Sequence, residues 1–299
     1  MRIYKTPSYR AFQIFNVLLM ISICFLILYP LYYMLIISFS NGSDVLSGNV
    51  RWYPMGITTR AYRAILRDGS FVGSYKNTII ITLLGTTVNL IMTTLAAYPL
   101  SRRDLMGRKF MMKCATFTMF FTGGMIPNYL LVTSLKLHNS YWAIVIPGAI
   151  SVYNMIIMRT FFEGLPVSLS EAAYIDGASD IGILLRIVVP LSKPIFLTMI
   201  LFYAVGHWNG YFSALLYLND ETMYPIQLFV RKIVLAGETL SINMAANVVA
   251  EGTEHGMTML AEQSTKYAIV ILSILPILIV YPIISKYFKS GVMIGAIKE

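Results

Sequence analysis

The stretch of sequence that decides the fold is LPVSLSEAAYIDGASD, residues 165–180. It carries three acidic residues, yet it lies between two runs, 137–158 and 194–219, that contain no charged residue at all. A helix needs about 20 mostly apolar residues to cross roughly 30 Å of hydrocarbon. The stretch therefore predicts a polar connection between two membrane-crossing segments.

The composition of the whole chain is that of a membrane protein. Its 299 residues are 57% hydrophobic and only 12% charged, with a mean hydropathy of +0.68, whereas soluble domains average about 25% charged residues. We predict an all-α fold, a polytopic membrane helical bundle that forms one transmembrane domain over residues 1–299. The uncharged runs place six transmembrane helices near 14–39, 77–98, 111–132, 141–161, 194–218 and 267–287.

The basic residues orient this bundle. Lys and Arg next to membrane spans prefer the cytoplasm, so the basic clusters within 2–10 and 102–113 predict that both termini are cytoplasmic. The basic residues of 50–76 disagree, and we interpret this segment as an outer loop with an amphipathic stretch. The net charge of +9 matches anionic lipid headgroups, so no nucleic acid partner is expected.

The connection itself predicts a short first helix on the cytoplasmic side. Ser168 and Glu171 have the spacing of a capping box, in which hydroxyl and carboxylate each satisfy a free backbone amide. Gly177 can adopt the left-handed conformation that ends a helix. The first helix is therefore expected over 169–176.

A second helix is expected to follow at once. Ser179 or Asp180 can cap its start, and Pro190 should end it because proline lacks a backbone N–H. The result is a helix, turn, helix unit over 165–190, tied at both ends to spans that it could push. The alternative is an interfacial helix pair lying on the headgroups, but its acidic residues would then face anionic lipid.

The string EAAYIDGA at residues 171–178, followed by Ile187, Pro190 and Pro194, closely resembles the EAA loop of ABC importer permeases. The likeness covers nearly the whole chain, although Pro99 stands where Ala is more usual. Further strings resemble the carbohydrate-uptake (maltose-type) branch of that family: NT at 77–78, AAY at 96–98 with LSR at 100–102, GGMIP at 123–127, WN at 208–209 and GVMIG at 291–295.

The resemblance implies partners and a mechanism. Such a permease of the bacterial cell membrane pairs with a second permease subunit, expected here to be a different chain, and receives solute from an extracellular solute-binding protein. Two cytoplasmic ATPase subunits hold ATP and Mg and grip the EAA loops, so that ATP-driven closure turns the spans from inward-facing to outward-facing. This chain itself would bind no cofactor.

Carried onto this sequence, the resemblance gives each coupling residue a role. Glu171 would pair with a basic group of the ATPase, Ala172 and Ala173 would fit its cleft, and Gly177 would make the turn. The full set of expected coupling residues is Glu171, Ala172, Ala173, Asp176, Gly177, Ala178 and Pro190.

The transported solute is expected to be a carbohydrate, and within that class an oligosaccharide. Sugar sites combine aromatic faces with polar groups, and polar groups within a span face the bundle interior or a water-filled cavity. Each aromatic candidate can instead be an anchor at the membrane interface. The candidates for the substrate pathway are Tyr153, Asn154, Tyr203, His207, Trp208, Asn209 and Tyr211.

Other functional classes fit the sequence less well. A secondary transporter carries ion-coupling carboxylates inside its spans, whereas Asp and Glu here fall in loops or termini. The chain has neither an H-E-x-x-H motif nor a phosphate-binding G-x-x-x-x-G-K-[ST] motif, so we expect a transport subunit and not an enzyme. Glu251, Glu254 and His255 match no metal motif, and no metal site is expected. A permease for a non-sugar solute and a passive channel stay open.

Overall fold

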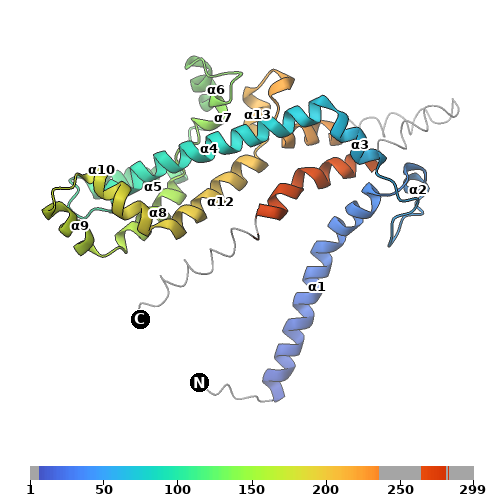
Figure 1. Ribbon diagram of the computed structural model, residues 1–299, viewed down its shortest axis with the longest axis horizontal. Coiled ribbons are helices and arrows are strands. Elements are labelled where there is room, and N and C mark those ends of the chain that lie inside the picture. The colour runs from blue at the N-terminus through green and yellow to red at the C-terminus, as the bar shows by residue number, and fades with distance from the viewer. Residues whose placement is uncertain (1–6, 236–263, 281, 283–299) are drawn as a thin grey trace. The chain divides into compact units, whose positions relative to one another are not determined.

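The computed structural model describes residues 7–235, 264–280 and 282, and the regular elements of this part are all helical (Figure 1). The chain divides into two compact units. The first combines Met1–Asp68 with Val230–Ile274, and the second combines Gly69–Phe229 with Leu275–Glu299. The predicted all-α class is confirmed.

The first unit is dominated by one long helix with little buried surface. Helix α1, Pro7–Ser38, has a mean hydropathy of 2.5, and none of its most apolar window is buried within the chain. Its buried residues lie in the last turn, where Ile36 and Ile37 join Val50 in a small core, and one to two turns earlier Tyr29 and Tyr32 contact Trp52. The short helices α2, Gly42–Leu46, and α3, Arg60–Arg67, follow. The exposed length of α1 is therefore suited to lipid or to another protein, not to water.

The second unit is built around α4, Gly69–Ser101. Figure 1 shows this helix running beside α8, Val152–Glu163, and α12, Lys193–Asn209. A third of the most apolar window of α4 is buried, against none for α1. The buried core of the unit includes Ala97, Tyr98, Met155, Met158, Ile183 and Met199.

The start of α4 fixes a distant loop, which explains the NT string of the sequence. Asn77 Nδ2 donates to the carbonyl oxygens of Thr222 and Tyr224 at 2.7 and 3.2 Å, and Asn77 Oδ1 accepts from the Tyr141 hydroxyl. Thr78 Oγ1 accepts from the backbone N–H of Ile226 at 2.7 Å. The loop containing η2, Glu221–Met223, is thus held by side chains of α4.

The prediction of one continuous helix over 111–132 is wrong. The structure has two helices there, α5, Arg108–Phe120, and α6, Met125–Ser134. They are separated by four non-helical residues that end at Gly124, whose φ of +88° is a conformation that glycine adopts at little cost. The charge-free run gave no sign of this break because it reports apolarity and not backbone conformation.

The fourth and fifth predicted spans, 141–161 and 194–218, are also interrupted. The fourth consists of α7, Trp142–Val145, and α8, with a non-helical stretch between them. The fifth consists of α12 and α13, Phe212–Tyr217, separated at Gly210, where the backbone is extended. Non-helical backbone at membrane depth is tolerated only where protein or a water-filled cavity satisfies it.

In the described part of the chain, α1 and α4 are long and apolar enough to cross a membrane unaided. A third candidate is the bent pair Asp180–Leu191 and Lys193–Asn209, whose two parts meet at 84°. The predicted span 267–287 is helical as far as it is described, within Ser264–Val280. Glu251, Glu254 and His255 lie outside the described residues.

Candidate functional site

The inner segment, residues 165–190, begins with helix α9, Val167–Ile175. The predicted capping box is wrong: α9 starts two residues earlier than expected, Pro166 stands at the N-cap, and Ser168 lies inside the first turn. The fixed φ of proline, −59° here, suits a residue that leads into a helix. Glu171 is therefore free of a capping role and is exposed.

The turn after α9 is confirmed at Gly177, whose φ is +80°. The N–H of Gly177 donates to the carbonyl of Tyr174 at 3.0 Å, and the N–H of Ala178 donates to that of Ala173 at 2.9 Å. This is the pattern of a Schellman motif, in which a left-handed residue satisfies the last carbonyls of a helix. The turn therefore has a fixed direction and is not a flexible link.

The second helix starts as predicted but does not end at Pro190. Ser179 Oγ accepts from the N–H of Gly182 at 3.2 Å and so caps α10, Asp180–Ile183. The chain then widens into a π-helix, Leu184–Val188, and passes through Pro190 within α11, Val189–Leu191. A π-turn changes the hydrogen-bond ladder, so the missing N–H of proline is accommodated and the bend moves to Ser192.

The adjacent alanines Ala172 and Ala173 of the segment face different environments. Ala173 is only 8% exposed and belongs to the buried core of the second unit, together with Tyr98 and Ile183. Ala172 is exposed. Since Ala173 packs inward, the segment is attached to the bundle by its own core residues and presents a separate outer face. That face carries Glu171, Ala172, Ile175, Asp176 and Ile181.

The carboxyl-terminal end of α4 meets this segment at a cluster of charged and aromatic side chains. Arg102 Nη2 donates to the Tyr98 hydroxyl, and the Tyr174 hydroxyl donates to Asp180. The hydrogen bond to Asp180 raises the pKa of Tyr174. These side chains line a cavity of about 320 Å³.

A second ionic cluster holds the ends of three helices together. Glu163 of α8 pairs with both Arg108 of α5 and Arg159 of its own helix. The Nε atoms of the two arginines donate to the carbonyl of Leu100 at 2.8 and 3.1 Å. Positive charge at the carboxyl end of a helix is favourable, so the cluster stabilises the end of α4. Nothing in the sequence indicates this cluster, because Arg108 and Glu163 are 55 residues apart.

The interior of the second unit contains a polar network centred on Asn89 of α4. Asn89 Nδ2 donates to the carbonyls of Gly148 and Ala149 at 2.6 and 2.9 Å, in the gap between α7 and α8. Asn89 Oδ1 lies 2.6 Å from Nε2 of His207. Asn89 thus provides a hydrogen-bond donor for the free carbonyls between α7 and α8, and it also binds His207 of α12. The only sign of it in the sequence is an amide within an apolar run.

Tyr203 and His207 approach this network from α12. The Tyr203 hydroxyl lies 2.6 Å from Thr93 Oγ1 and accepts from the N–H of Ser151 at 3.4 Å. A side chain at Gly85 would overlap the His207 ring, so α4 and α12 approach closely there. Tyr203 and His207 also line a cavity of about 220 Å³ with Asn89, Gly148 and Ser213.

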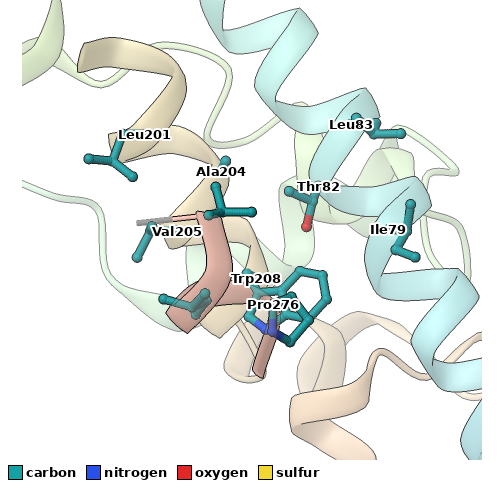
Figure 2. Close-up of a pocket in the computed structure, with 10 residues that line it drawn as sticks. Ile79, Thr82, Leu83, Leu201, Ala204, Val205, Trp208 and Pro276 are labelled. Atoms are coloured by element: carbon teal, nitrogen blue, oxygen red, sulfur yellow. The ribbon is translucent and has the colours of Figure 1, made fainter. Parts of the chain in front are cut away.

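The remaining pathway candidates do not converge on that cavity. Trp208 points into a separate apolar pocket of about 200 Å³, with Thr82 of α4 and Pro276 of the last described helix (Figure 2). Asn154 is buried, while Tyr153 is 56% and Tyr211 40% exposed and Asn209 is exposed. Of the seven candidates, only Tyr203 and His207 line the polar cavity.

No group of three or more potential metal ligands occurs in the described residues. Asp220 has a lowered pKa because it accepts from the backbone and the hydroxyl of Thr222. This carboxylate therefore stabilises a loop turn.

Comparison with known proteins gives a consistent result. A family model described as binding-protein-dependent transport system inner membrane component matches residues 3–294. The polygalacturonan/rhamnogalacturonan transport system permease protein YtcP of Bacillus subtilis (strain 168) is 40% identical over 286 residues, 95% of this chain and 96% of its own length. Protein LplC of the same organism is 38% identical over 295 residues, 99% and 97% of the two chains.

A solved structure is similar over nearly the same length. It is a chain of a bacterial ABC transporter involved in the import of the acidic polysaccharide alginate. The two chains share 35% sequence identity with a TM-score of 0.85, over 96% of this chain and 99% of that chain.

Proposed function

Because the chain belongs to the family of binding-protein-dependent transport system inner membrane components, in its carbohydrate-uptake branch, we propose that it forms half of the pathway of an ATP-driven oligosaccharide importer. Membership makes the chain a multi-pass permease subunit of the inner membrane, and not the enzyme of the transporter.

The main support for the proposal is that the inner segment has one buried side and one exposed side. Its buried side, with Ala173 and Ile183, belongs to the bundle core, while Glu171 and Ala172 are exposed on the other side. Because the turn at Gly177 and the cap at Ser179 are hydrogen-bonded and one side is packed, the segment can transmit force to the bundle as a rigid unit. Glu171 then pairs with a basic group of an ATPase, Ala172 enters its cleft, and Ala173 with Gly177 keeps the helix in place.

The proposed topology keeps six crossings and cytoplasmic termini, within a single domain over 1–299. Helices α1 and α4 cross unbroken, and the last crossing contains Ser264–Val280. The other three consist of helix pairs: α5 with α6, α7 with α8, and the bent segment leading through α12 to α13. The inner segment then lies in the cytoplasm, because it follows the fourth crossing.

The proposed assembly supplies what this chain lacks. Two cytoplasmic ATPase subunits hold ATP and Mg, a second permease of different sequence completes the pathway, and a solute-binding protein delivers the solute outside. The family description supports dependence on a binding protein. The long exposed apolar surface of α1 supports contact with lipid or with a second subunit.

The proposed solute is an oligosaccharide, and acidic ones are the first to test. The similar YtcP protein is named for polygalacturonan and rhamnogalacturonan transport, and the similar solved transporter imports alginate. In this chain, Tyr203 and His207 supply an aromatic face and polar groups at one cavity, the combination that sugars require. Asn154, Tyr153, Trp208, Asn209 and Tyr211 are secondary candidates.

The experiment is reconstitution. The complex is purified through this chain, its ATPases and binding protein are identified, and uptake of oligogalacturonate and of a neutral oligosaccharide into proteoliposomes is measured with ATP inside. We expect uptake that requires both ATP and the binding protein. Uptake that persists without any ATPase would contradict the proposal and favour a channel, and uptake of peptides alone would contradict the sugar assignment.

A further inference from the structure

Arg102, directly after α4, has hydrogen-bonding capacity that the described conformation does not use. Its Nη2 donates to the hydroxyl of Tyr98 at 2.5 Å, and its Cζ lies 4.9 Å from the centre of the Tyr98 ring. Its Nε is buried and has no hydrogen-bond partner among the described residues. A buried donor without an acceptor is destabilising, so its presence calls for a physical reason.

Two carboxylates line the same cavity as this donor, and of these Asp180 belongs to the inner segment whereas Asp104 follows α4 in the chain. Arg102 and Tyr98 line one part of the cavity of about 320 Å³, and Tyr174 and Asp180 of the inner segment line another. Asp180 accepts from the Tyr174 hydroxyl, and no ion pair joins it to Arg102 in the described part of the chain. The guanidinium of Arg102 is thus hydrogen-bonded to Tyr98 and the carboxylate of Asp180 to Tyr174, and both pairs line the same cavity.

The charges nevertheless influence each other. Burial opposes the charge of Arg102, but the hydrogen bond with Tyr98, the attraction of Tyr98 and Tyr174 and, as the smallest contribution, the attraction of Asp180 together outweigh it and raise the pKa of Arg102. The neighbouring arginines are in different situations. Arg108 and Arg159 are engaged by Glu163 and the Leu100 carbonyl, and Arg103 is exposed.

We propose that Arg102 is the positioning residue that transmits movement of the inner segment to α4, by exchanging Tyr98 for a direct ion pair with Asp180 when the segment moves. The inference rests on the proposed function, because an ATPase must move the segment. A guanidinium suits this exchange, since its planar fork can stack on an aromatic ring in one state and bind a carboxylate in the other.

The first test compares Arg102→Gln with Arg103→Gln in the reconstituted complex, as sugar imported per ATP hydrolysed. Both variants remove one positive charge at adjacent positions. Arg102→Gln should lower the ratio about 5- to 150-fold, the usual range for coupling between two sites, with the yield of the assembled complex unchanged. Arg103→Gln should leave the ratio as in the wild type. Equal ratios for both variants would overturn the proposal.

A second test is independent of transport. Cysteines replace Arg102 and Asp180 in a chain whose native Cys24 and Cys114 are changed to Ser, and disulfide formation is followed with and without trapped ATP and Mg. A disulfide requires Cα atoms about 4.4–6.8 Å apart. The proposal predicts that the bond forms faster in one nucleotide state, and equal rates in both states would overturn it. A wild-type complex that imports no sugar would instead refute the proposed function.

Discussion

The inner segment and the polar interior of the second unit both depart from a simple bundle of apolar helices, but in opposite ways. In the inner segment, the turn at Gly177 and the cap at Ser179 are bonded within five residues along the chain. In the interior, Asn89 bonds Gly148 and His207, which are 59 and 118 residues away. Local bonds therefore fix the shape of the segment, whereas long-range bonds in the interior hold separate helices together.

The largest effect on stability is expected for Asn89→Leu. The change leaves two carbonyls and the His207 ring without their partner in the interior. At about 1 kcal/mol for each lost hydrogen bond, the folded chain should be destabilised by about 3 kcal/mol. Thermal unfolding of the purified complex measures this loss. Asn128→Leu, at an exposed position, is the matched control, and an equal change in both variants would remove the distinction drawn for Asn89.

The next largest effect on stability is expected for a substitution on the buried side of the inner segment, compared with one on its exposed side. Ala173→Leu adds volume to a packed core and should destabilise the complex by about 2 kcal/mol. Ala172→Leu should change stability by less than about 0.5 kcal/mol, because the residue is exposed, yet it should weaken binding of the ATPases. Thermal unfolding and co-purification measure the two effects. If both variants melted alike, the buried and exposed sides would not differ as described.

The smallest effect on stability is expected for a substitution at Gly177, in the turn after α9. Gly177→Ala places a side chain on a residue with φ of +80°, which should cost about 1 kcal/mol. Gly73→Ala, in helix α4 with open space around the new methyl group, should instead be neutral or slightly stabilising. Thermal unfolding again compares the pair. A neutral Gly177→Ala variant would show that the turn can relax and is not rigid.

Structural features that depend on neighbouring residues could be predicted from the sequence, whereas features that depend on distant contacts could not. The helical class, the turn at Gly177 and the cap at Ser179 could be predicted, because charge-free runs and neighbouring residues determine them. The breaks after Phe120 and Val145 and at Gly210 could not, because a uniformly apolar run gives no information on backbone continuity. The start of α9 was misplaced because Pro166 competes with the capping box.

The site was predicted in the same uneven way. Glu171, Gly177 and Ala178 followed from a contiguous string, whereas Asn89, Thr93 and Arg102 depend on partners that only the folded chain brings near. Tyr203 and His207 were expected with Trp208 on one helix, but a helix distributes neighbouring positions around its axis. The structure accordingly directs Trp208 to a different pocket from His207.

The most direct measurement of the central claim is the amount of sugar imported per ATP hydrolysed by a complex containing Glu171→Lys. The exposed face of the inner segment, not the stability of the bundle, should limit this variant, because Glu171 makes no contribution to the core. We predict that the complex inserts into the membrane normally while the ratio falls at least about tenfold. Import at the wild-type rate and ratio would contradict the account.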